Sequence, residues 1–65
     1  MNRKELTKDM QKYAGSGFIT RTKLAAYMGK SNPRHVDKYL AGLERIGTNY
    51  FIPDVVEALL REVSR

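Results

Sequence analysis

Most of the side chains that could do chemistry lie near the middle of the 65-residue chain, and they are basic. Arg34, His35 and Lys38 follow Pro33 at spacings that place all three in the first two turns of a helix. At the exposed start of a helix, an arginine can bind a guanine edge through two hydrogen bonds, and a lysine can reach a base or a phosphate. This pattern predicts recognition of a nucleic acid rather than catalysis.

Further basic and hydroxyl side chains flank this segment. Lysine and arginine neutralise phosphates, and hydroxyl groups or backbone N–H groups at a helix start can add hydrogen bonds to them. We expect phosphate contacts from the following flanking residues: Arg21, Thr22, Lys23, Lys30 and Ser31.

Two residues of the segment leave alternatives open. His35 could read a guanine, could change its charge near the ordinary histidine pKa of about 6.5, or could be a solvated residue with no special role. Asp37 could accept a hydrogen bond from a cytosine amino group, could pair with Arg34 or Lys38, or could indicate that the exposed face is rotated.

The sequence lacks the groupings that enzymes and metal sites need. No nucleophile has a base beside it, no glycine-rich loop could hold a nucleotide, and His35 is the one histidine of a chain without cysteine. Asp54 and Glu57 are spaced as a helix cap rather than as a catalytic pair. We therefore expect no enzymatic activity, no cofactor, no metal and no small-molecule ligand.

The charge balance favours a polyanionic partner, although simple solubility would explain a basic chain as well. Lys and Arg number 12 against 7 Asp and Glu, which gives a net charge of +5. Residues 1–30 carry seven basic and two acidic groups, residues 31–50 three and two, and residues 51–65 two and three. The last segment, with more acidic than basic groups, is thus not expected to face the polyanion.

Length and composition predict a single small domain over residues 1–65. A hydrophobic content of 42% favours a folded globule over a disordered chain. No stretch approaches the ~20 apolar residues of a membrane span, and no apolar run follows the first residues as in a signal peptide. We expect a cytoplasmic protein without a membrane partner.

Hydrophobic spacing predicts three helices in the first two thirds of the chain. Leu6, Met10 and Tyr13 recur on one helical face, and Gly15 would end this first helix, expected over Arg3–Ala14. The second helix would be capped by Thr20 or Thr22 and would run to about Met28. The third would cover residues 33–40, with Ser31 or Asn32 as its cap and Gly42 as its stop. Tyr27 and Tyr39 lie on apolar stripes, which favours packing over donation to phosphates.

A hairpin and a fourth helix complete the expected order. Residues 43–46 and 50–52 would pair around the turn cluster Gly47-Thr48-Asn49, since the second run is aromatic and β-branched. Asp54 would cap the last helix, with Glu57 in the answering position. The expected core comprises Leu6, Met10, Tyr13, Phe18, Ile19, Leu24, Met28, Val36, Leu40, Leu43, Ile52, Val56, Leu59 and Leu60.

The two short helices joined across Gly29 match a helix-turn-helix, in which the second helix is locked by Val36 and Leu40 and exposes its other face. Residues 20–56 resemble the winged helix-turn-helix of excisionases and of MerR-type regulators. The residues that carry the resemblance are 24–31 (LAAYMGKS), Val36, Tyr39, Leu40, 50–52 (YFI) and 54–56 (DVV). The resemblance implies a mainly α, small winged helix-turn-helix fold, with the helix of Arg34, His35 and Lys38 in the major groove. It also implies a wing that contacts the minor groove or backbone through Arg45, Thr48 and Asn49.

The residues and the resemblance together predict a sequence-preferring protein that binds double-stranded DNA in a phage or mobile element. An excisionase-like factor that directs recombination is the first interpretation, with a site-specific recombinase or further copies of the chain as partners. A small MerR-like regulator of transcription is the second. A protein-interaction module or inhibitor without a DNA role is the alternative from another class, in which the basic face would meet an acidic protein surface.

Overall fold

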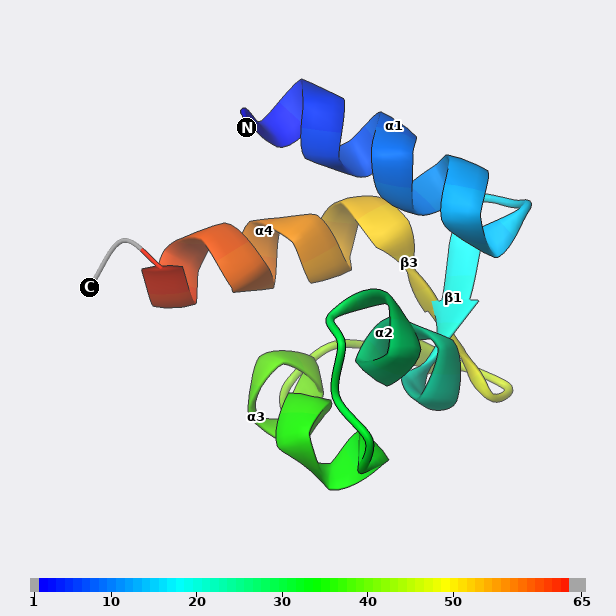
Figure 1. Cartoon of the computed structure of the whole chain (residues 1–65), viewed down its shortest axis with the longest axis vertical. Coiled ribbons are helices and arrows are strands. Elements are labelled where there is room, and N and C mark those ends of the chain that lie inside the picture. Colours follow the sequence, from blue (N-terminus) through cyan, green and yellow to red (C-terminus); the bar gives the residue numbers. More distant parts are fainter. Residues whose placement is uncertain (1, 64–65) are drawn as a thin grey trace.

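The computed structural model describes residues 2–63 and shows a mainly helical molecule with a small three-stranded antiparallel sheet (Figure 1). Helices α1 and α4 lie side by side at one end, and α2 and α3 form the other. No helix among the described residues is long and apolar enough to cross a bilayer. The elements are α1 Arg3–Ala14, β1 Phe18–Thr20, α2 Arg21–Tyr27, the 3₁₀ helix η1 Pro33–Val36, α3 Asp37–Leu40, β2 Arg45–Ile46, β3 Asn49–Phe51 and α4 Ile52–Val63.

Helices α1 and α2 begin and end where the sequence predicts. The Asn2 side chain caps α1 by accepting a hydrogen bond from the Glu5 N–H at 2.8 Å. Gly15 ends this helix in the left-handed conformation, with φ of 78°, and its N–H donates to the Gln11 carbonyl. Thr20, one of the two expected caps, accepts from the Lys23 N–H at 3.1 Å and starts α2.

The third predicted helix is present but changes its winding. Asn32 is its cap and accepts from the Arg34 N–H at 3.0 Å, after which Pro33–Val36 forms a 3₁₀ turn. The α-helical part is limited to Asp37–Leu40. Because the first turn is wound as a 3₁₀ helix, the segment is held mainly by its buried Val36 and Leu40 rather than by a long hydrogen-bond ladder.

The predicted hairpin is present with shorter bounds: Leu43 and Glu44 precede β2, Ile52 belongs to α4, and the turn is limited to Gly47 and Thr48 because Asn49 belongs to β3. Arg45 lies opposite Tyr50. The sheet also contains β1, a strand that the sequence reading missed, and β3 lies in the middle of the order β1-β3-β2. Ile19 pairs with Tyr50 across β1 and β3, so the chain before α2 is tied directly to the chain before α4.

The last helix starts two residues before the expected cap, so the predicted capping box of Asp54 and Glu57 is wrong. Helix α4 begins at Ile52, directly after β3, and Asp54 lies in its first turn. Ile52 is fully buried, and its N–H donates to the Gly17 carbonyl at 3.0 Å. Pro53 is compatible with this early position because the first N–H groups of a helix have no partner within it.

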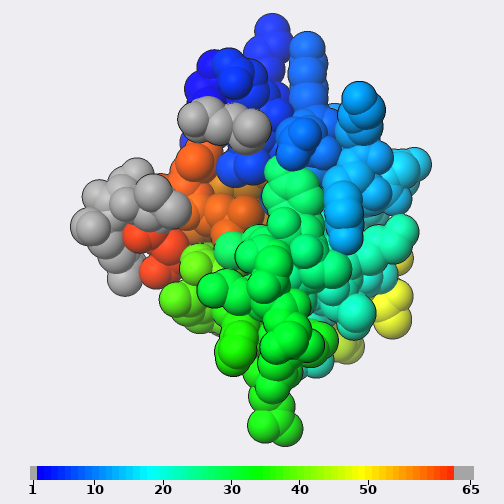
Figure 2. Space-filling model, in the orientation of Figure 1, coloured from blue at the N-terminus to red at the C-terminus, as the bar shows by residue number. Residues whose placement is uncertain are grey.

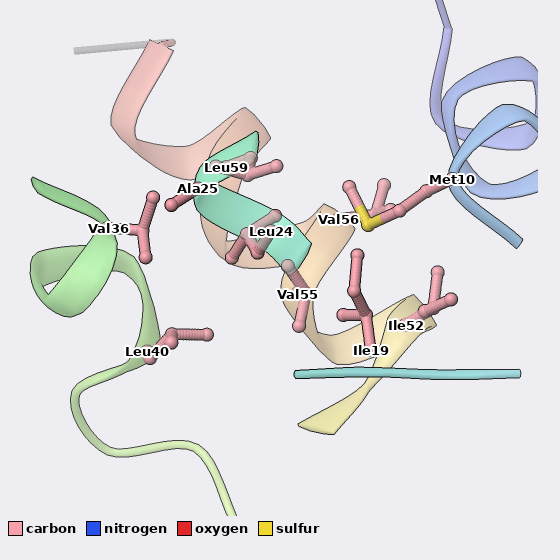
Figure 3. Close-up of a cluster of buried hydrophobic side chains, with 10 residues drawn as sticks. All are labelled: Met10, Ile19, Leu24, Ala25, Val36, Leu40, Ile52, Val55, Val56 and Leu59. Atoms are coloured by element: carbon pink, nitrogen blue, oxygen red, sulfur yellow. The ribbon is translucent and has the colours of Figure 1, made fainter. Parts of the chain in front are cut away.

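The core lies between α1, the sheet, α2, the segment of η1 and α3, and α4 (Figure 3). Its buried apolar residues are Met10, Ile19, Leu24, Ala25, Val36, Leu40, Ile52, Val55, Val56, Ala58 and Leu59. Ala25, Val55 and Ala58 are buried but missing from the predicted core, which placed only Val56, Leu59 and Leu60 of the last helix inside. Leu6, Met28, Leu43 and Leu60 are only partly buried against this core.

Two aromatic residues of the predicted core are exposed instead. Tyr13 is 48% exposed and lies at the rim, where its ring is 5.2 Å from that of Tyr27. Phe18 is 39% exposed because strand alternation turns it away from the side on which Ile19 is buried. It lies opposite Phe51, with ring centroids 5.5 Å apart, on the outer face of the sheet.

Candidate nucleic-acid interface

The turn between α2 and η1 fixes which face of the following segment is exposed. Gly29 has φ of 74°, a left-handed conformation that strongly favours glycine, and Lys30 N donates to the Ala25 carbonyl at 2.8 Å. Beyond the turn, Val36 is fully buried and Leu40 is 5% exposed, and both belong to the core cluster that contains Leu24 (Figure 3). The residues between them on the other side of the segment therefore face outward.

Those outward residues line an open hollow of about 470 Å³, which we call the first hollow. Its lining residues are Lys30, Arg34, His35, Lys38 and Tyr39. Three of the five carry a full positive charge, one is a histidine, and none is a carboxylate. The Lys38 ammonium lies 5.0 Å from the centre of the Tyr39 ring, a distance at which the ring attracts a cation. The hollow is thus a cationic surface whose hydrogen-bond donors lie at the ends of side chains of different lengths.

A second hollow, of about 220 Å³, joins the start of α2 to the hairpin. Its lining residues are Thr20, Arg21, Thr22, Arg45, Thr48 and Tyr50. Two guanidinium groups meet four hydroxyl-bearing side chains there, and again no carboxylate lines the surface. Hydrogen-bond donors of these kinds suit phosphate oxygens.

An ion pair joins Arg21 of the second hollow to Asp37, which lines neither hollow. Arg21 Nε donates to Asp37 Oδ1 at 2.6 Å, and its terminal nitrogen donates to Oδ2 at 3.0 Å. This two-point geometry links the first residue of α2 to the first residue of α3. The hydrogen bond from Arg21 lowers the pKa of the Asp37 carboxyl, and the bond to Asp37 raises the pKa of the Arg21 guanidinium. Of the alternatives left open for Asp37, pairing with Arg34 or Lys38 is wrong, since Arg21 is its ion-pair partner.

The structure gathers eight of the eleven predicted contact residues into these two surfaces. Lys30, Arg34, His35 and Lys38 line the first hollow, and Arg21, Thr22, Arg45 and Thr48 line the second. Lys23 and Ser31 are exposed but line neither hollow, and Asn49 is half-buried in β3 opposite Thr20 and Ile46. The sequence reading missed Thr20, Tyr39 and Tyr50 as lining residues. Tyr50 belongs to a predicted strand, but its place beside Thr20 and Arg21 follows from the pairing of β3 with β1, which the sequence did not indicate.

Tyr27, considered as a phosphate donor, is used inside the molecule. Its hydroxyl donates to Asp9 Oδ2 of α1, which ties α1 to α2. Partial burial and this hydrogen bond raise the pKa of Tyr27 to about 12. Packing at the rim, the favoured interpretation, agrees with this arrangement.

Comparison with protein-family models, with curated proteins and with solved structures finds no match to this chain. Within residues 2–63, no group of three or more His, Asp and Glu side chains could hold a metal ion. The chemistry that the two hollows do offer is hydrogen bonding and charge neutralisation by cations and hydroxyls.

Proposed function

We propose that the protein binds double-stranded DNA as a small winged helix-turn-helix. In this proposal, α2 and the segment formed by η1 and α3 are the two helices, and the β2–β3 hairpin is the wing. The segment of η1 and α3 would enter the major groove, which is wide enough for a helix. The β2–β3 hairpin would lie along the DNA backbone beside this groove.

The observation that carries the proposal is the make-up of the first hollow. Arg34, His35 and Lys38 lie at the exposed start of a segment whose opposite side is buried, and no carboxylate lines the surface that they share with Lys30. A guanidinium in this position can make the paired hydrogen bonds that distinguish guanine from the other bases. The second hollow supports the proposal because Arg45 and its hydroxyl side chains could hold phosphates nearby, while Arg21 is paired with Asp37.

We propose further that binding is non-enzymatic and that the protein acts in the cytoplasm by positioning DNA or a partner. An excisionase-like role in recombination is our first choice, because the element order follows the resemblance of residues 20–56 to that family. A MerR-like role in transcription rests on the same residues and differs in the partner that the protein would recruit.

The test is selection of a binding site from a random duplex pool, followed by titration of the selected duplex with Arg34→Ala. We expect this variant to lose about 1–3 kcal/mol of binding free energy, or about 5- to 150-fold in affinity, at the selected site. Arg61→Ala is the matched control, because Arg61 is an exposed arginine of α4 that lines neither hollow.

Equal affinities of the Arg34→Ala variant and the unchanged protein would contradict the assigned reading surface. Absence of binding even at low salt would overturn the DNA proposal as a whole. In that case, an acidic protein surface would become the expected partner of the first hollow.

A further inference from the structure

A second cationic surface lies on α1. Lys4, Lys8 and Lys12 recur every four residues and are all exposed. Residues four apart lie on one face of a helix, and Lys8 is about 160° around α1 from Met10, which is fully buried in the core. The three lysines therefore form one row, which we call the lysine row, on the side of α1 that faces away from the molecule.

The carboxylates of α1 are engaged by other groups. Glu5 accepts a hydrogen bond from the Asn2 amide at 2.9 Å, and Asp9 accepts from the Tyr27 hydroxyl. Across residues 2–63, the one ion pair joins Arg21 to Asp37, outside α1. No carboxylate thus lies within ion-pair distance of the lysine row, although Glu5 and Asp9 precede Lys8 and Lys12 by three residues and offset part of the repulsion between the lysines. Helix α1 keeps four basic against two acidic side chains, so an external polyanion would still be attracted to it.

The lysine row and the first hollow face opposite ends of the molecule. Helix α1 lies at one end of the longest axis, which spans 27 Å, and η1 and α3 lie at the other (Figure 1). The space-filling view shows the same separation, with the blue surface of α1 at the top and the green surface of residues around η1 at the bottom (Figure 2). A straight duplex held in the first hollow would therefore leave the lysine row uncovered.

We infer that the lysine row binds the phosphates of a second duplex segment, so that one molecule bridges two segments of DNA. This inference rests on the proposed function, because the first hollow must hold the first segment. From Lys4 to Lys12 the helix rises about 12 Å. One strand of a duplex presents three or four phosphates over that length, about one for each lysine. The contact would be independent of sequence, since ammonium groups that reach only phosphates read no bases.

The test uses an immobilised duplex that carries the selected site and a fluorescent duplex without the site. We expect the unchanged protein to retain the second duplex on the first, with a salt slope of about −3 for the second capture. The triple variant Lys4→Gln, Lys8→Gln, Lys12→Gln should reduce this retention at least tenfold and change affinity for the first duplex less than threefold. The triple variant with arginine at the same three positions is the matched control and should retain the second duplex.

Several outcomes separate the possible failures. Binding of the first duplex without retention of the second would overturn the bridging inference and leave the proposed function intact. Equal retention by the glutamine variant would also overturn it, and sedimentation would then show whether bridging comes from two copies of the chain. Failure to bind the first duplex would refute the proposed function itself. Glutamine has nearly the helix propensity of lysine, so thermal melting should confirm that the variant is folded.

Discussion

Replacing Asp37 with asparagine should tighten DNA binding, although the residue lies on the segment proposed to enter the major groove. Asp37 holds the Arg21 guanidinium through two hydrogen bonds of 2.6 and 3.0 Å. Both side chains are about half exposed, so the pair lies where a phosphate could compete for the arginine. Asp37→Asn removes the carboxylate and makes Arg21 available to DNA.

The size of the effect follows from the cations that each form presents. Besides Arg34, which is assigned to a base, the two hollows contain three basic side chains that carry no ion pair, namely Lys30, Lys38 and Arg45. Three phosphate contacts give a slope of log K against log salt of about −2.7. Release of Arg21 adds a fourth contact and a slope of about −3.6, which corresponds to about eightfold tighter binding at about 0.1 M salt.

Fluorescence anisotropy over a salt series measures both the affinity and the slope. Glu57→Gln is the matched control, because it raises the net charge by the same amount at an exposed position of α4. Its slope should stay close to that of the unchanged protein. Weaker binding by Asp37→Asn, or an unchanged slope, would refute the reasoning and would show that the ion pair matters by orienting α3 against α2.

Two further predictions concern stability. The pKa of Tyr27 is raised to about 12, above the ordinary value of about 10, so its contribution is full below about pH 10 and is lost as the pH rises through about 12. Tyr27→Phe should therefore lower stability by about 1 kcal/mol at neutral pH, because it removes the hydrogen bond to Asp9, and it should flatten the alkaline decline of the melting temperature. Identical pH profiles would contradict the raised pKa of Tyr27. Gly29→Ala should lower the stability by about 1–2 kcal/mol, because alanine is strained at the φ of 74°. A clash is not the reason, since a Cβ at this position would meet no atom within 4 Å. Gly17→Ala, which has open space and no such φ, should be near neutral, and equal melting of the two variants would rule out backbone strain as the cause.

The parts of the fold that the sequence predicts correctly depend on near neighbours. Asn32 and Pro33 start η1, and Gly15 ends α1, through groups only a few residues away. The periodic face of α1 likewise identifies Met10 as buried. Such interactions need no knowledge of the rest of the molecule, so residue types and spacing are enough to find them.

The parts that the sequence does not predict depend on residues far apart in the chain. Strand β1 has only three residues, too few for alternation to be distinguished, and it exists because β3 pairs with it from about 30 residues away. The partner of Asp37 lies 16 residues before it, whereas helical spacing favoured nearer cations. The exposure of Phe18 also follows from β1, since it is strand pairing that turns this side chain outward.

For the candidate site, the sequence predicts which basic side chains take part, but not that they group into two separate hollows. The turn at Gly29 and the buried Val36 were enough to place Arg34, His35 and Lys38 on one face. The separation into two hollows depends on where the hairpin lies beside α2, which no local pattern specifies. Whether these surfaces bind DNA stays a prediction until the titrations are made.

The pairing of β1 with β3 has a consequence for how the chain could diversify. Residues 21–48 leave and return at neighbouring strands, while α1 and α4, outside them, pack on each other. The molecule thus consists of a frame and an insert, and the insert carries most of both hollows. As long as Leu24, Val36 and Leu40 keep their buried places, the outward residues of the insert can change without altering the frame. A new target preference could then arise by exchange of a single continuous stretch of sequence.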